Sequence, residues 1–150
     1  MKNIATTLSL TFVLLLGSIG TSWGTDFLKG LNAYHSGDFA TALREWTPLA
    51  EQGHSPSQYN LGFMHYKGEG IPQDYETAVK WLTRAAKQDH VDAQFRLGAM
   101  YWSGIGVLQD YTAALKWYTL AAEQGDSNAQ NNLGVMYANG RKSRDIIEKK

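Results

Sequence analysis

The chain has 150 residues, of which 43% are hydrophobic and 19% are charged, a composition that excludes a disordered chain and predicts a packed core. The formal net charge is zero, but residues 25–140 carry eight basic and twelve acidic side chains. No nucleic-acid partner is therefore expected, since such a partner requires a basic surface. The absence of cysteine excludes disulfides and thiolate metal sites.

Residues 1–24 have the order of a secretory signal peptide. Lys2 gives a positive start, the apolar run is densest over residues 8–16 (LSLTFVLLL), and small and polar residues follow. Cleavage is expected after Gly24 or after Gly20. Because a membrane-spanning helix needs about 20 apolar residues, we expect an exported protein, periplasmic or secreted, with no stable membrane anchor after cleavage. The alternative is an uncleaved anchor.

The remainder of the chain is built from a recurring unit. LGFMHYKGEG at 61–70 returns as LGAMYWSGIG at 97–106, so that Leu61 and Leu97 stand 36 residues apart, and a shorter LGVMYANG follows at 133–140. A fixed period of this length is typical of helical solenoids, in which each unit stacks on the next.

Each unit predicts two helices. The first helix of the unit 55–90 is expected to begin at Ser55, an N-cap in a capping box with Gln58, and to end at Gly68. The stretch SNAQ at 127–130 repeats this start, whereas Val91 at the equivalent position predicts a weaker one.

The second helix of each unit is expected to follow an aspartate N-cap. Along it, Ala78, Trp81 and Ala85 recur at helical spacing and predict a core stripe. Gly62 is expected to let the two helices approach closely, because a glycine inside a helix costs about 0.5–1 kcal/mol without such a reason. The positions expected to be structural are Leu61, Gly62, Gly68, Asp74, Ala78, Trp81, Leu97, Gly98, Gly104, Asp110, Ala114 and Trp117.

The combined pattern, LGxMYxxGxGVxxDYxxAxxWxxxAAxxG, is similar to the Sel1-like repeat, a relative of the tetratricopeptide repeat with a longer turn between its helices. Residues 55–90 and 91–126 are complete units, and 127–140 resembles the first helix of a third. Residues 25–54 resemble the shorter tetratricopeptide form. The resemblance implies an all-α, right-handed α-α superhelical solenoid whose first helices line the concave face.

The pattern breaks off after residue 140. Residues 141–150 form a charged tail with five basic and two acidic side chains. Either this tail is a short cap or the chain is a truncated remnant of a longer array. An uncapped helix over 127–140 would leave Leu133 and Met136 partly exposed and would favour self-association.

No motif for catalysis or metal binding accompanies the repeats. The histidines lack a spacing such as HExxH, and His65 stands where the next unit has Tyr101. A cysteine-rich branch of the Sel1 family is described as binding or hydrolysing penicillins, but its paired cysteines are absent here. We therefore expect no metal, no cofactor and no enzymatic activity. The alternative is a hydrolase of β-lactam or cell-wall-derived substrates.

Positions that vary between units are expected to carry function. On the first helices these positions hold aromatic and polar side chains, which suit recognition of a peptide or protein. The expected partner-binding residues are Tyr59, Asn60, Phe63, Tyr66, Lys67, Phe95, Arg96, Trp102, Ser103, Asn131 and Asn139. The alternative is that rings such as Phe63 and Phe95 only pack against the neighbouring unit. The leading hypothesis is a non-catalytic scaffold that binds a peptide or protein segment in its groove.

Overall fold

The computed structural model describes the backbone of residues 23–148 and the side chains of residues 23–140, so the predicted signal peptide lies almost wholly outside the described residues. Within this part, every regular element is a helix. A helix over 23–35 precedes α2 (Phe39–Glu51), α3 (Ser55–Lys67), α4 (Tyr75–Ala86), α5 (Val91–Ser103), α6 (Tyr111–Glu123) and α7 (Ser127–Glu148). None of the described helices combines the length and the apolar character that crossing a membrane requires.

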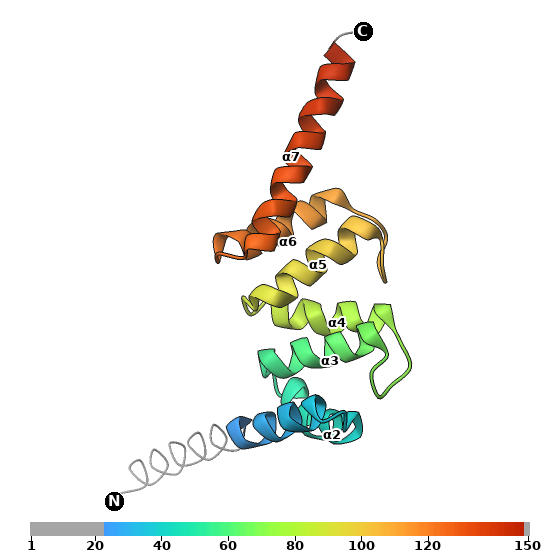
Figure 1. Cartoon of the computed structure of the whole chain (residues 1–150), viewed down its shortest axis with the longest axis vertical. Coiled ribbons are helices and arrows are strands. Elements are labelled where there is room, and N and C mark those ends of the chain that lie inside the picture. Colours follow the sequence, from blue (N-terminus) through green and yellow to red (C-terminus); the bar gives the residue numbers. More distant parts are fainter. Residues whose placement is uncertain (1–22, 149–150) are drawn as a thin grey trace, which may run out of the picture.

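The helices form a single stack. Each one packs against its neighbour in the chain, and the stack runs from residues 23–51 at one end to α7 at the other (Figure 1). The expected all-α solenoid is therefore confirmed.

The starts of the first helices differ from the predicted capping boxes. His54, rather than Ser55, is the N-cap of α3, with an extended backbone at φ −66° and ψ 106°. At the equivalent position, the Asp126 carboxylate accepts a hydrogen bond from the Ala129 amide at 2.6 Å. His90 caps α5 in the same place, so the weak start predicted from Val91 was also wrong. Gln58 turns its side chain to the preceding unit, where it donates to the Ala50 carbonyl, and therefore does not close the predicted capping box.

The turns inside the units agree with the sequence prediction. Gly68 and Gly104 end α3 and α5 in the left-handed conformation, at φ 73° and 68°. The Asp74 side chain accepts from the Thr77 amide at 3.0 Å, and Asp110 caps α6 in the same way. These caps satisfy backbone donors that would otherwise have no partner at the helix start.

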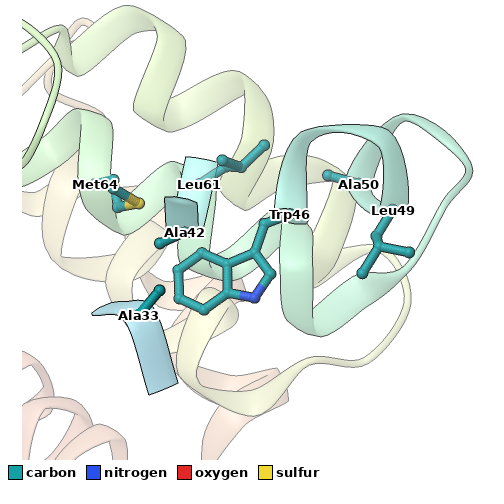
Figure 2. Close-up of a cluster of buried hydrophobic side chains, with 7 residues drawn as sticks. All are labelled: Ala33, Ala42, Trp46, Leu49, Ala50, Leu61 and Met64. Carbon is teal, nitrogen blue, oxygen red and sulfur yellow. The ribbon is translucent and has the colours of Figure 1, made fainter. Parts of the chain in front are cut away.

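The core of the described residues consists of three apolar clusters, each of which joins the second helix of one unit to the first helix of the next. In the first cluster, the Trp46 indole lies at the centre of the group, with Ala33 and Ala42 beside it (Figure 2). The expected role of Trp81 needs correction: Leu82 is the large side chain of α4 that is fully buried, and Trp81 is half-buried and packs against the first cluster. Ala78 and Ala85 are fully buried as predicted, and only Trp81 is replaced in the stripe, because Leu82 faces the glycine of α3.

Close helix contact at the recurring glycine is confirmed. A Cβ atom on Gly62 would lie 2.8 Å from Leu82 Cγ, and one on Gly98 would lie 2.6 Å from Tyr118 Cδ1. In the first unit Gly30 faces Trp46 in the same manner. Glycine is thus required at Gly30, Gly62 and Gly98 because a large side chain of the second helix fills the space beside each of them.

Helix α7 does not end at residue 140, where the repeat pattern places the end of the third first helix. It continues through Gly140 to Glu148. The sequence after Gly140 lacks the turn pattern that follows Gly68, and a single glycine inside a helix costs only about 1 kcal/mol. Leu133 and Met136 are half-buried against the third cluster, while Val135 and Tyr137 are 56% and 58% exposed.

Candidate binding groove

Three hollows lie at the successive junctions between units, on the first-helix face, the surface formed by helix 23–35, α3, α5 and α7. Their volumes are about 200, 120 and 140 Å³ in chain order. Each is lined by an aromatic residue of one unit and by two positions of the next first helix. These sets are Tyr34 with Asn60 and Phe63, Tyr66 with Arg96 and Ala99, and Trp102 with Asn132 and Val135. The hollows are therefore a product of the repeat itself.

Most of the expected partner-binding residues lie along these hollows, and three do not. The lining residues among them are Tyr59, Asn60, Phe63, Tyr66, Phe95, Arg96, Trp102 and Ser103. Lys67, Asn131 and Asn139 are exposed and lie outside these three hollows. Asn132 lines the third hollow instead of Asn131, which follows from its spacing of 36 residues from Arg96.

Sequence reasoning missed the contribution of the first unit. Leu31, Tyr34 and His35 line the first hollow together with Trp46. The 36-residue period does not reveal them, because the turn of the first unit is shorter. Tyr34 could have been found by placing Gly30 on Gly62, since both glycines face the large side chain of the second helix.

Part of the aromatic stripe is occupied in holding adjacent units together. The Tyr59 ring stacks on His90, the cap of the next first helix, with ring centroids 4.6 Å apart. Arg96 lies over Phe63 with its Cζ 4.2 Å from the ring centroid, and its Nε donates to the Tyr59 hydroxyl at 3.3 Å. These side chains therefore have both a packing role and a place on the groove surface.

A chain of glutamines fixes the distance between units behind the hollows. The Gln58 amide donates to the Ala50 carbonyl at 2.9 Å, and the buried Gln94 donates to the Ala86 carbonyl at 3.1 Å. Gln88 then donates to the Gln58 side-chain oxygen at 2.7 Å. Since the buried side chains of Gln58 and Gln94 need hydrogen-bond partners, these bonds favour a single register of each unit on the previous one.

Burial is the main influence on the ionisable side chains of this face. Burial, with a hydrogen bond of 2.6 Å to the Glu69 carboxylate, raises the pKa of Tyr34 to about 12. Burial lowers the pKa of His90, which lies under the Tyr59 ring. Within the described residues, no group of three metal-ligating side chains lies together. The arrangement presents aromatic rings, amides, hydroxyls, the His35 imidazole and the Arg96 guanidinium, which are groups that can contact a peptide.

Comparison with known protein families identifies the repeat from which this geometry is built. The Sel1 repeat profile matches residues 55–90, 91–126 and 127–148. The chain belongs to the Sel1 repeat family. Proteins built on Sel1 repeats generally mediate protein–protein interactions, and the fold is typically a non-enzymatic scaffold. No curated protein matches the chain.

Solved structures show the same Sel1 repeat architecture. A Sel1 repeat protein from Oxalobacter formigenes is 31% identical at a TM-score of 0.72, over 75% of this chain and 46% of its own. A protective antigen present in uropathogenic Escherichia coli strains is 36% identical at a TM-score of 0.76, over 85% of this chain and 28% of its own. This chain thus spans less than half of either relative.

A more distant structure shows the likeness of fold alone. Helicobacter pylori cysteine-rich protein B is 18% identical at a TM-score of 0.61, over 79% of this chain and 94% of its own.

Proposed function

We propose that this Sel1 repeat protein is a non-catalytic scaffold that binds an extended peptide segment of a partner protein across the hollows of the first-helix face. The recurrence of the hollows carries the proposal, because an extended chain laid across the first helices meets one equivalent hollow at each junction. The aromatic lining supplies large contact area at low cost in conformational entropy.

The groove is preorganised for such a ligand. The glutamine contacts and the Tyr59–His90 stack hold neighbouring first helices in register before any partner arrives. Preorganisation increases affinity because less side-chain and backbone freedom is lost on binding.

Variants that fill the hollows test the proposal without disturbing the core. Ser103 is exposed and lines the central hollow, and Asn60 lines the first. Peptides selected from a random display library on the full chain should bind wild type and fail to bind Ser103→Trp combined with Asn60→Trp. Lys80→Trp is the matched control, since Lys80 is exposed on α4, away from the first helices. Binding that survives both groove substitutions would place the ligand elsewhere.

The same preparation addresses the hydrolase alternative. The purified chain should not turn over nitrocefin or peptidoglycan above the buffer rate. A turnover that one side-chain substitution abolishes would replace the scaffold proposal with an enzymatic one.

We also propose that the scaffold acts outside the cytoplasm, in the periplasm or as a secreted protein. The positive start and the short apolar run of residues 1–24 support this location. The likeness to a protective antigen of Escherichia coli supports it by analogy. Fractionation of cells expressing the full chain tests the proposal, and a chain of unprocessed mass in the cytoplasm would contradict it.

Self-association through α7 is a further part of the proposal. Val135 and Tyr137 leave apolar surface on the last described helix, more than half exposed. Light scattering across a range of concentrations should detect a dimer that Tyr137→Glu dissociates, since Tyr137 lies outside the three hollows. A monomer at all concentrations would contradict self-association through α7 and would not affect the proposal that the groove binds a peptide.

A further inference from the structure

The central hollow contains an arginine that forms no ion pair with an acidic side chain among the described residues. Arg96 is half-buried, and its Nε donates to the Tyr59 hydroxyl. Its two terminal nitrogens donate to no described side chain or carbonyl. The ion pairs of the described chain lie elsewhere, where Glu45 binds Lys29 at 2.8 Å and Arg44 at 3.1 Å.

The guanidinium is held in place by the rings around it. The Arg96 Cζ lies 4.2 Å from the centroid of Phe63 and 5.8 Å from that of Tyr66. With its plane supported by aromatic rings and its Nε bonded, Arg96 loses little freedom when a ligand binds to its terminal nitrogens. A fixed guanidinium edge favours carboxylates, which it binds with two parallel hydrogen bonds.

The lining of the three hollows contains no carboxylate. Besides Arg96 its ionisable side chains are those of tyrosines and His35, although residues 25–140 carry more acidic than basic side chains. The neighbouring Glu69 already accepts a hydrogen bond of 2.6 Å from Tyr34. The middle of the first-helix face is thus a local basic site on an otherwise mildly acidic body.

The positions equivalent to Arg96 are uncharged. Asn60 stands in the first hollow and Asn132 in the third. Amide side chains can donate to and accept from a peptide backbone, so these hollows place no charge requirement on a ligand. A ligand that spans all three needs complementary charge only at its middle.

We propose that the central hollow binds an aspartate or glutamate side chain inside an extended partner segment, through the terminal nitrogens of Arg96. This inference rests on the proposed function. The acidic residue is internal because equivalent hollows lie on both sides of the central one, so the bound chain continues in both directions. The flanking residues of the segment are apolar or small, to match the rings and amides of the outer hollows.

The test is a selection from random peptides displayed between constant flanking sequences, on the full chain and on Arg96 variants. Wild type should enrich peptides with Asp or Glu at one fixed position. Arg96→Gln should lose that preference, and Arg96→Glu should replace it with Lys or Arg. For a selected peptide, exchanging the acidic residue for its amide should weaken binding to wild type roughly 10-fold or more. The same exchange should have little effect on Arg96→Gln.

Arg84→Gln is the matched control. Arg84 also lies over an aromatic ring, with its Cζ 4.7 Å from Trp81, but it belongs to α4 rather than to the groove. Its substitution should leave the acidic preference unchanged. Circular dichroism and the Tm of each variant report whether the fold is intact, and Arg96→Lys retains the charge if Arg96→Gln fails to fold.

The outcomes separate this inference from the function on which it rests. Groove-dependent peptides with no acidic preference would overturn the role of Arg96 and leave the scaffold standing. An acidic preference seen only in a library that ends in a free carboxylate would overturn the internal position. If no peptide is enriched, or if enrichment ignores the hollow-filling variants, the proposed function fails as well.

Discussion

Gln94 and Ala86 join two successive repeats through a hydrogen bond that is closed to solvent. The Gln94 amide donates to the Ala86 carbonyl at 3.1 Å, and the two residues are 0% and 1% exposed. Gln124 donates in turn to the Gln94 side-chain oxygen at 2.8 Å. The buried Gln94 side chain therefore has a partner for its amide nitrogen and for its oxygen. These bonds fix how one repeat packs on the next.

Gln94→Met should destabilise the chain because it keeps the shape of the side chain and removes the donor. The Ala86 carbonyl keeps its bond from the Asp89 amide at 3.1 Å, but the side-chain hydrogen bond between the repeats is lost, which costs about 0.5–1.5 kcal/mol. Gln130 makes the equivalent bond to the Ala122 carbonyl at 3.2 Å but is exposed, so water can replace it in Gln130→Met. Urea denaturation of both variants checks the difference, and equal losses would contradict a role for burial.

Two glycines at equivalent positions should respond to alanine in opposite directions. In Gly98→Ala the new Cβ would lie 2.6 Å from the Tyr118 ring, and such overpacking costs about 1–3 kcal/mol. No atom lies within 4 Å of a Cβ built on Gly134. Gly134→Ala should therefore stabilise α7 by about 0.5–1 kcal/mol through helix propensity. Thermal unfolding should show a lower Tm for the first and a higher Tm for the second; the same sign for both would refute the close-contact account.

The protein should lose stability in mild acid. Burial lowers the pKa of His54, His65 and His90 below the value of 6.5. As the pH falls through about 6.5 the unfolded chain takes up protons first, so the stability present above that pH is lost on acidification. The lowered pKa values of Asp38 and Asp74 affect the stability only at a pH near or below 3.8.

The histidine effect can be separated by one substitution. His90→Asn keeps a good N-cap and removes one titrating group, so it should reduce the loss of unfolding free energy between neutral pH and about pH 5. An unchanged or larger loss would exclude His90 as a source of the pH dependence.

If the chain is exported as proposed, the processed form should begin at Thr21. Trp23 belongs to the fold: its indole nitrogen donates to the Gln52 side chain at 3.1 Å, and its ring lies 5.6 Å from that of His54. Cleavage after Gly24 would remove these contacts, whereas cleavage after Gly20 retains them. Mass spectrometry of the processed protein distinguishes the two, and a mature form starting at Thr25 would show that the contacts of Trp23 are dispensable.

The sequence alone was sufficient for the fold and for the turns. Gly68, Gly104, Asp74 and Asp110 behave as predicted, because left-handed glycines and aspartate caps depend on local backbone chemistry. The errors concern interactions between units. Trp81 and Leu82 exchange roles because burial depends on which side chain faces the glycine of the partner helix, and a helical period does not fix this to one residue.

At the candidate site, too, the sequence predicts which positions are equivalent but not which side chains are in contact. The period alone places Arg96, Asn60 and Asn132 at equivalent positions. It does not show that Arg96 lies over Phe63 or that Tyr59 stacks on His90, since each contact joins side chains that are far apart in the sequence. It also leaves out Tyr34, because the first unit has a shorter turn and a different spacing.

Chemical-shift mapping of a selected peptide on the isotope-labelled full chain tests the scaffold proposal most directly. The account predicts that the largest amide shifts fall on the first helices, around Asn60, Arg96 and Asn132, with smaller changes on α2, α4 and α6. Largest shifts on the second helices, or on the exposed surface of α7 alone, would contradict it.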